Sequence, residues 1–391
     1  MRHRLGWLLL ASATIAPGAP AVQAAPPAQA AAPAADAALA QAVDRAAAEL
    51  IASKASAGFS VAIYRDGRPL LVKGYGFANL EDRVPARAET VYRIGSITKE
   101  FTAAAILLLA ERGKLSVDDK LAKFLPDFPR GGEVTLRQLL THTSGIRNYT
   151  DETWLAEAST REMSMAQMID YIARQKPLFD FEPQTGWAYS NSAFYLLGAV
   201  IEKVSGQSYA RFLEENLTKP LALNDTKIDD LAEIVPHRAA GYVKAPGTPT
   251  GFANAAFISM SAAGAAGAIR STVSDLARWH EALLGGKVLK PESLKIMLEP
   301  GRLKDGRLAS AARKAPPGAP PQTGTSDYGF GIAASERDGR RSIGHGGSIN
   351  GFNSSLQTYT EDGTTIAILT NTLPAAGAVS AAILKAVLPA R

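Results

Sequence analysis

A serine and a lysine three residues apart, Ser96 and Lys99, form a pair that could carry out covalent chemistry. On a helix, residues at this spacing share one face about 5–6 Å apart, so the amine can approach the hydroxyl. A serine attacks a carbonyl only when a base removes its proton, and a lysine with a lowered pKa can be that base. The pair alone is weak evidence, because a chain of this length contains about one chance match, and a serine at a helix start is more often an N-cap.

Two further segments carry polar side chains that could act on the same substrate. Tyr189 and Asn191 are two residues apart in a loop, so in an extended backbone a phenol and an amide point to the same side. Residues 344–348 read Gly-His-Gly-Gly-Ser after an expected strand, and glycines there let a backbone approach a ligand closely. Each segment alone is ordinary, since a loop tyrosine usually packs and a glycine run usually marks a turn. In this order, the three motifs together are specific.

The motifs resemble those of the β-lactamase and penicillin-recognising serine hydrolases. They are Ser96-x-x-Lys99, Tyr189-x-Asn191 and His345-x-Gly347. The pattern is similar to the class C β-lactamase branch, which includes D-alanyl-D-alanine carboxypeptidases, D-aminopeptidases and esterases. Tyr-x-Asn stands where some members carry Ser-x-Asn, and His-x-Gly where many carry Lys-Thr-Gly. The resemblance covers nearly all of residues 40–388.

The resemblance implies a mechanism in which Ser96 becomes acylated and water then releases the acyl group. It makes Tyr189, beside Lys99, the expected proton relay and general base, and leaves open which of the two accepts the first proton. Asn191 is expected to orient the substrate amide or Lys99. The implied oxyanion hole consists of the backbone N–H groups of Ser96 and Ser348, where negative charge develops.

The sequence departs from the family pattern at His345-Gly346-Gly347, which is expected to bind substrate. Lys-Thr-Gly enzymes place a cation and a hydroxyl against a substrate carboxylate. Here Gly346 has no hydroxyl, and a histidine is near its charge boundary at neutral pH. We therefore expect an exported hydrolase of D-amino-acid peptides, of the D-alanine carboxypeptidase or D-peptidase type, or of small esters. A class C-like β-lactamase and a penicillin- or peptidoglycan-binding protein with negligible turnover are the alternatives.

Composition excludes several other chemistries. The 391 residues include no cysteine, which removes thiol nucleophiles, thiolate zinc sites, iron–sulfur clusters and disulfides. His237 and His280 have no partner at metal-ligand spacing, and the Gly-x-Ser-x-Gly motif of α/β-hydrolases is absent. His142, in a Thr/Ser-rich segment, is expected to make structural hydrogen bonds and not to take part in catalysis. We expect no cofactor and no metal.

The net charge and the N-terminal residues indicate which partners and which cellular location to expect. The net charge is +5, from 42 basic and 37 acidic residues that are scattered, so no nucleic acid is expected. Arg2 and Arg4 precede an apolar stretch, residues 5–16, and Val22-Gln23-Ala24 offers a cleavage site. The expectation is a signal peptide over 1–24, an Ala/Pro-rich tether over 25–40 and a periplasmic or secreted protein. Once the signal peptide is removed, we expect no integral membrane segment. We also expect a monomer that acts on a small-molecule or peptide substrate, with peptidoglycan as one source.

The elements that must position these residues form an expected α+β, β-lactamase/transpeptidase-like fold. Hairpin signals Asp66-Gly67, Asp338-Gly339 and Asp362-Gly363 place strands at both ends of the chain, among them one over 328–335. Apolar periodicity predicts helices over 36–53, 98–112, 136–140, 165–174, 192–204, 209–216, 273–284 and 376–388. The hydrolase domain is expected over 41–388, with its sheet from about 41–95 and 260–388 and an inserted, mostly helical part from about 96–259. Residues 303–326 are expected to be an exposed loop.

Overall fold

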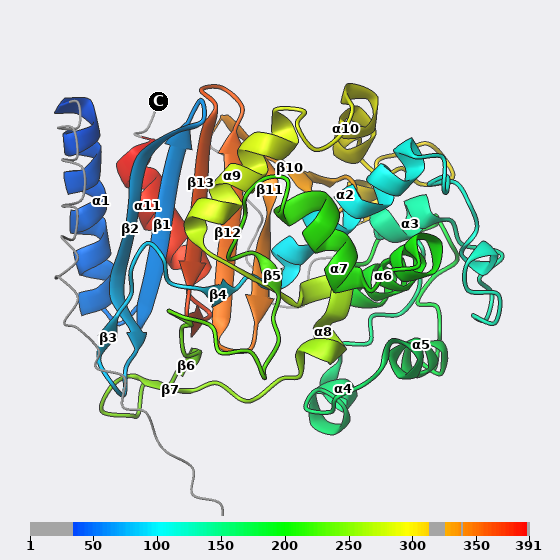
Figure 1. Cartoon of the computed structure of the whole chain (residues 1–391), viewed down its shortest axis with the longest axis horizontal. Coiled ribbons are helices and arrows are strands. Elements are labelled where there is room, and N and C mark those ends of the chain that lie inside the picture. The colour runs from blue at the N-terminus through cyan, green and yellow to red at the C-terminus, as the bar shows by residue number, and fades with distance from the viewer. Residues whose placement is uncertain (1–33, 313–324, 338, 389–391) are drawn as a thin grey trace, which may run out of the picture.

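The computed structural model describes residues 34–312, 325–337 and 339–388, and its main feature is an eight-stranded antiparallel sheet (Figure 1). In spatial order its strands are β3 (Val84–Pro85), β2 (Arg68–Asn79), β1 (Gly58–Arg65), β13 (Thr364–Thr370), β12 (Phe352–Tyr359), β11 (Arg340–Ile349), β10 (Ala333–Arg337) and β9 (Thr325–Tyr328). Because β1 pairs with β13, strands from the two ends of the chain meet inside one sheet. The expected α+β fold is confirmed, whereas the expected signal peptide lies outside the described residues.

The strand expected over 328–335 is instead two strands. β9 ends at Tyr328 and β10 begins at Ala333, and these two residues pair across an antiparallel ladder. Between them, Phe330 N donates to Met297 O over 2.8 Å and Gly331 N to Leu140 O over 3.4 Å. These bonds to the helical part hold the intervening residues out of the sheet, and local apolar content alone could not indicate them.

The central strand β13 shows how the sheet separates two cores. Its Ile366 and Ile368 pack with α1 (Ala34–Ala52) and α11 (Ala376–Val387) on one face. Its Ala367 and Leu369 belong to the larger core on the opposite face. Since successive side chains of a strand alternate between faces, one strand supplies both cores.

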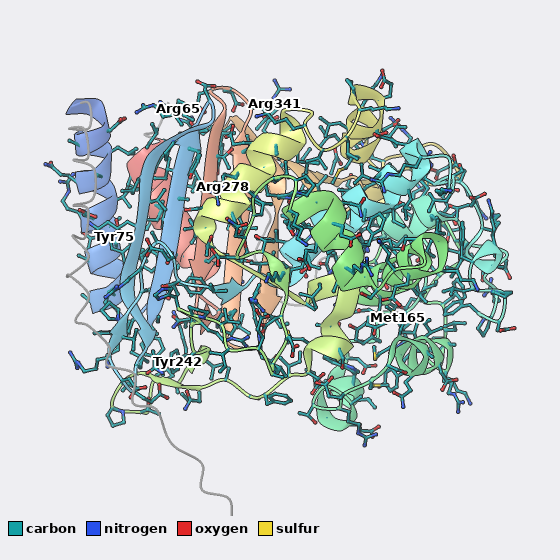
Figure 2. All side chains as sticks on the ribbon, viewed as in Figure 1. Arg65, Tyr75, Met165, Tyr242, Arg278 and Arg341 are labelled. Atoms are coloured by element: carbon teal, nitrogen blue, oxygen red, sulfur yellow. The ribbon has the colours of Figure 1, made fainter. Side chains whose placement is uncertain are left out.

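Polar contacts at the sheet edge hold α1 in place. Tyr75 of β2 lies on the side of the sheet toward α1 (Figure 2), and its hydroxyl donates to Asp44 Oδ1 over 2.7 Å. Asp44 also accepts a hydrogen bond from Lys73 Nζ over 2.8 Å. The carboxylate therefore joins the helix to two residues of β2.

The larger core lies between the sheet and the helices that lie in front of it and to its right in Figure 1. Those helices are α2 (Thr98–Glu111), α3 (Leu136–Leu140), α4 (Glu152–Glu157), α5 (Met165–Ala173), α6 (Asn191–Ser205), α7 (Tyr209–Leu213), α8 (Met260–Gly267), α9 (Val273–Leu284) and α10 (Pro291–Leu298). Two three-stranded sheets complete the fold, β4 (Tyr92–Arg93) with β8 (Ile269–Ser271) and β5 (Lys227–Ile228), and β14 (Thr372–Leu373) with β6 (Tyr242–Lys244) and β7 (Phe252–Asn254). Within the described ranges, no helix is both long and apolar enough to cross a membrane.

A buried polar cluster fixes the first turn of α2 against α9. Glu100, fully buried, accepts from Trp279 Nε1 over 2.9 Å and lies 3.2 Å from His280 Nε2. The other ring nitrogen of His280 is 2.8 Å from Thr358 Oγ1 in the sheet. Because a buried carboxylate is costly unless it is hydrogen-bonded, this cluster holds α2 at one register relative to the sheet.

Candidate active site

Ser96 lies in a 3₁₀ turn, Gly95–Ile97, immediately before α2. The residue at the N-cap of α2 is Ile97, which makes no side-chain cap. Ser96 is therefore not an N-cap, the commonest structural role for a serine at this position. Its Oγ lies 3.1 Å from Lys99 Nζ, as the three-residue spacing predicts.

Lys99 is fully buried, and three polar groups surround its amine. Nζ lies 3.1 Å from Ser96 Oγ, and it donates to Asn191 Oδ1 and to the Ala266 carbonyl, each over 2.7 Å. Burial disfavours the ammonium form and lowers the pKa of Lys99 well below its ordinary value. A lysine with a lowered pKa can accept a proton near neutral pH.

Asn191 is the first residue of α6, so the expectation of an extended backbone there is wrong. Ser190 is the N-cap, and its Oγ accepts from Ala193 N over 3.2 Å, so the helix begins one residue after the cap. Asn191 Nδ2 donates to Thr150 Oγ1 over 2.9 Å. That bond turns the amide oxygen toward Lys99.

Tyr189 lies over Lys99, with its ring centroid 4.7 Å from Nζ. Its hydroxyl is buried and has no hydrogen-bond partner of ordinary geometry among the described residues. Burial raises the pKa of Tyr189 above its ordinary value, and the neighbouring Ser96 hydroxyl offsets only part of that shift. The phenol is therefore protonated at neutral pH.

His142 holds the loop that carries Tyr189. Its Nδ1 accepts from Ser190 N and its carbonyl from Ala188 N, each over 3.1 Å, so the contacts lie on both sides of Tyr189 in the sequence. The rings of His142 and Tyr189 are 4.4 Å apart between centroids. These contacts give His142 a structural role in the site.

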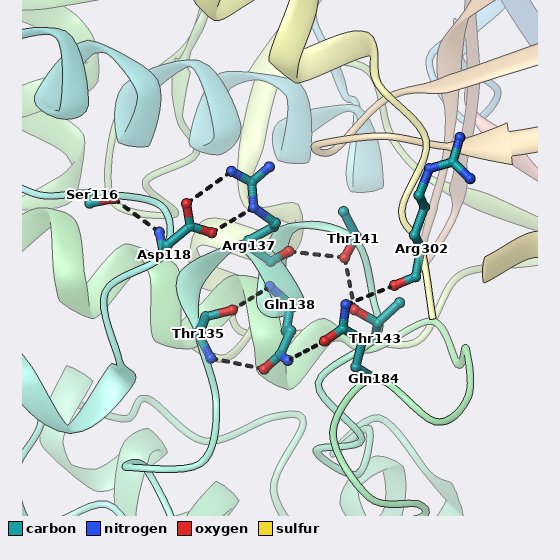
Figure 3. A network of polar contacts seen from close by, with 9 residues as sticks. All are labelled: Ser116, Asp118, Thr135, Arg137, Gln138, Thr141, Thr143, Gln184 and Arg302. Carbon is teal, nitrogen blue, oxygen red and sulfur yellow. Dashed lines mark hydrogen bonds and ion pairs between the residues drawn. The ribbon is translucent and has the colours of Figure 1, made fainter. Parts of the chain in front are cut away.

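A polar network around α3 connects this loop with its neighbours (Figure 3). Gln138 Nε2 donates to Gln184 Oε1 over 3.3 Å, and Gln184 Nε2 donates to the Arg302 carbonyl over 3.2 Å. Thr141 and Thr143, on either side of His142, share a hydrogen bond of 2.9 Å between their hydroxyls. The backbone on both sides of the His142 and Tyr189 rings is thus fixed by side-chain hydrogen bonds.

His345 is buried in β11 with both ring nitrogens engaged. Nδ1 faces the Gly346 carbonyl, which can only accept, so Nδ1 carries a proton. Nε2 lies 2.9 Å from the Tyr328 hydroxyl. Burial and the nearby Lys99 lower the pKa of His345 to about 4. The expectation of an imidazole near its charge boundary at neutral pH is therefore corrected: the ring is neutral, and Tyr328, to which the sequence assigned no role, donates to Nε2.

Gly347 and Ser348 pass directly against the turn that carries Ser96. A Cβ on Gly347 would lie 1.9 Å from the Ile94 carbonyl oxygen, so only glycine allows this approach. On the facing side, Gly95 has a φ of +53°, and a Cβ there would lie 2.8 Å from Ser348 N. This close contact brings the backbone N–H groups of Ser96 and Ser348 to the same part of the site.

Two cavities meet at Ser96 and Ser348. The smaller, about 170 Å³, is bordered by Asn191, the aromatic rings of Tyr149 and Trp154, and Ile258. The larger, about 470 Å³, is bordered by residues of β11 and β12, by the start of α11, and by Tyr189 and His345. In the part of the chain that the structure describes, no group of acidic or histidine side chains could hold a metal ion. Six of the seven residues that the sequence singled out line these two cavities. The seventh, Lys99, is buried beneath them, with Nζ 3.1 Å from Ser96 Oγ.

Comparison with known proteins identifies the family. The model of the Beta-lactamase family matches residues 43–388. The chain belongs to the Beta-lactamase family. Among its relatives, penicillin-binding protein 4* from Bacillus subtilis (strain 168) is 29% identical over 309 residues, which cover 76% of this chain and 64% of the relative. The putative penicillin-binding protein PbpX of the same strain is 29% identical over 315 residues, covering 80% and 70%. This Beta-lactamase family chain thus spans less than two thirds of the first of these relatives.

Solved structures agree with this family assignment. A D-stereospecific amidohydrolase from Streptomyces sp. superposes with a TM-score of 0.72 at 28% identity, over 90% of this chain and 98% of its own. The octameric penicillin-binding protein homologue from Pyrococcus abyssi gives 0.75 at 27%, over 88% and 76%. The D-amino acid amidase from Ochrobactrum anthropi SV3, at 24% identity and a TM-score of 0.74 over 89% and 98%, shares the fold. The protein is a serine hydrolase family member with a β-lactamase fold.

Proposed function

We propose that this protein hydrolyses amide or ester bonds through an acyl-enzyme on Ser96. The observation that carries the proposal is the 3.1 Å contact between Ser96 Oγ and a fully buried Lys99 whose pKa is lowered. The substrates we propose are short D-amino-acid peptides or small esters, with release of the acyl group by water. Among the structural neighbours, one above 25% identity is named a D-stereospecific amidohydrolase, which supports this choice.

The hydrogen bonds of Lys99 orient its neutral form as a base. Asn191 Oδ1 and the Ala266 carbonyl can only accept, so both N–H bonds of an uncharged amine face them. The nitrogen lone pair then faces the remaining neighbour, the Ser96 hydroxyl, which donates its proton to Nζ. Since Tyr189 is protonated at neutral pH, Lys99 is the first proton acceptor in this proposal, and the Tyr189 hydroxyl relays a proton toward the leaving group.

In the acylation step, Ser96 Oγ forms a bond to the substrate carbonyl carbon as its proton moves to Lys99. The negative charge on the carbonyl oxygen is stabilised by the N–H groups of Ser96 and Ser348. The bond to the leaving nitrogen or oxygen then breaks, and the leaving group takes the proton from Lys99, through Tyr189. A water molecule repeats the sequence on the acyl-enzyme and regenerates the Ser96 hydroxyl.

A penicillin-binding protein with negligible turnover is the second candidate, because two relatives carry that name. A class C-like β-lactamase is a third. The three differ in the fate of the acyl-enzyme: a hydrolase of D-peptides or esters and a β-lactamase continue past one equivalent, whereas the binding protein stops there. We also propose that the protein is a monomer and that it is exported to the periplasm or beyond, the latter because residues 1–24 have the pattern of a signal peptide.

The test monitors product and intact mass together with three compounds: benzylpenicillin, 4-nitrophenyl acetate and N-acetyl-D-alanyl-D-alanine. We expect more than one equivalent of product per enzyme from the ester or the peptide, and an acyl adduct on Ser96. Ser96→Ala should abolish both, and Ser205→Ala, at the C-terminal end of α6, is the matched control. Turnover that persists in Ser96→Ala would contradict the proposal, and faster hydrolysis of penicillin than of the other two would indicate a β-lactamase.

A further inference from the structure

The cleft around Ser96 contains no charged side chain among its described lining residues. The smaller cavity is lined by Ser96, Tyr149, Thr150, Trp154, Asn191, Ile258, Ala263, Ala266, Gly267, Ser348, Ile349 and Asn350. The larger is lined by Ser96, Tyr189, His345, Gly346, Gly347, Ser348, Asn353, Ser354, Ser355, Ala376, Gly377, Ser380, Ala381 and Leu384. Neither set includes an aspartate, glutamate, lysine or arginine. Its polar groups are hydroxyls, amides, backbone groups and one imidazole.

Three ionisable side chains near the cleft, two basic and one acidic, are already hydrogen-bonded within the protein. His345 is buried, and its two nitrogens face the Gly346 carbonyl and the Tyr328 hydroxyl. Lys99 lies beneath the cleft, where Ser96 and two carbonyl oxygens surround its amine. Glu100, a buried carboxylate next to Lys99 in the sequence, is held by Trp279 and His280 of α9.

The first backbone N–H groups of α11, the helix that borders the larger cavity, are also already hydrogen-bonded. A helix N-terminus attracts anions through its free N–H groups. At the start of α11, however, the N–H groups of Ala375 and Ala376 both donate to Asn353 Oδ1, over 3.2 and 2.8 Å. Asn353 therefore competes with a substrate carboxylate for these donors.

We propose that the substrate is uncharged on both sides of the scissile bond: an N-acylated D-amino-acid amide or a neutral ester. This inference rests on the proposed function and narrows it. A C-terminal carboxylate or a free α-ammonium would lose water in the cleft without gaining an opposite charge from its described lining residues, which disfavours binding. D-amino-acid carboxypeptidase substrates and penicillins, which carry a carboxylate, are therefore poorer substrates than their neutral counterparts.

The experiment compares two acetate esters that have the same acyl group and differ in the charge of the leaving group, methyl 4-acetoxybenzoate and 4-acetoxybenzoate, each corrected for its spontaneous hydrolysis. We expect kcat/KM to be at least about 10-fold higher for the methyl ester, because a charge that loses water on binding without gaining a partner is costly. A second pair, N-acetyl-D-alaninamide and D-alaninamide, tests the ammonium side in the same way. Equal rates within a pair, or faster hydrolysis of the charged member, would overturn the inference for that side.

A substitution in the larger cavity provides an independent measurement. Ser355→Arg introduces a cation there, and Ser355→Gln adds bulk without charge. Relative to the glutamine variant, the arginine variant should raise the ratio of charged to neutral ester hydrolysis by at least about 5-fold, since an opposite charge stabilises the bound carboxylate. An unchanged ratio would count against the inference. Failure of the proposed function is distinguishable, because then no ester would be hydrolysed in a Ser96-dependent manner.

Discussion

Asn191 Oδ1 lies 2.7 Å from Lys99 Nζ, closer than Ser96 Oγ at 3.1 Å. The amide is fixed from its other end, because Nδ2 donates to Thr150 Oγ1 over 2.9 Å. An uncharged acceptor in this place orients the amine. A carboxylate in the same place would also stabilise the charged form of the amine, and the amide does so much less. Asn191 therefore keeps Lys99 both oriented and weakly basic.

Changing Asn191→Asp tests this relationship through pH. A carboxylate beside an amine favours the ammonium and raises its pKa by about 1–3 units, which opposes the lowering that burial causes. Because the active form of Lys99 is uncharged, the acidic limb of the kcat/KM profile should move to higher pH, with activity at neutral pH reduced about 10-fold or more. Asn216→Asp, in the middle of the helical segment Glu214–Thr218 after α7, is the control for added charge. An unmoved limb would mean that Lys99 does not titrate in this limb.

His345 should remain neutral until well below pH 6, because its pKa is lowered to about 4. The folded pKa lies below the unfolded value of about 6.5, so the unfolded chain binds the proton first. The resulting stability is fully present above about pH 6.5 and is lost as pH falls toward 4, by up to about 3 kcal/mol. Urea unfolding of wild type and His345→Gln at neutral pH and near pH 4.5 measures the difference. A constant difference between the two proteins would show that the imidazole is not held neutral by the fold.

The contacts of Lys99 show which parts of the site the sequence could predict. Ser96 is three residues away on the same local segment, so helical spacing alone predicts their approach. Ala266 is 167 residues away and belongs to α8, which was not predicted because its run of alanine and glycine has no apolar periodicity. This helix packs against α6 and α2, and no local sequence pattern indicates that packing.

The charge of His345 could not be predicted for a related reason. Residue type supplies only the ordinary pKa, whereas the actual value depends on burial and on the proximity of Lys99. Tyr328, which donates to the ring, comes from β9, and β10 lies between it and β11 in the sheet. The sequence also did not predict that β9 ends at Tyr328, whose hydroxyl lies against His345. The fold class and the motif residues were predictable, but their electrostatic state was a consequence of tertiary contacts.

Adjacent glycines of β11 offer a matched test of the oxyanion hole. A Cβ at Gly347 would lie 1.9 Å from the Ile94 carbonyl oxygen and 2.4 Å from Ser354 Oγ, whereas at Gly346 the nearest atom, the Ser354 carbonyl oxygen, would be 3.5 Å away. Gly347→Ala should therefore push Ser348 away from Ser96 and reduce kcat about 100-fold or more, the cost typical of losing one oxyanion donor. Gly346→Ala should stay within about 3-fold of wild type. Steady-state kinetics with 4-nitrophenyl acetate decides, and equal losses in both variants would contradict this assignment of the oxyanion hole.

Asn353 of β12 also positions the segment of β11 that carries Ser348. Its Nδ2 donates to the Gly347 carbonyl and to Ser348 Oγ, each over 2.7 Å, while its Oδ1 accepts from the first turn of α11. Asn353→Ala should leave the Ser348 N–H misdirected, so kcat falls about 10-fold or more while KM for a neutral ester changes little. The affinity of phenylboronic acid, which forms a tetrahedral adduct on the serine, should fall in parallel with kcat. A lowered Tm with unchanged kcat and boronate affinity would instead mean that Asn353 only joins α11 to the sheet.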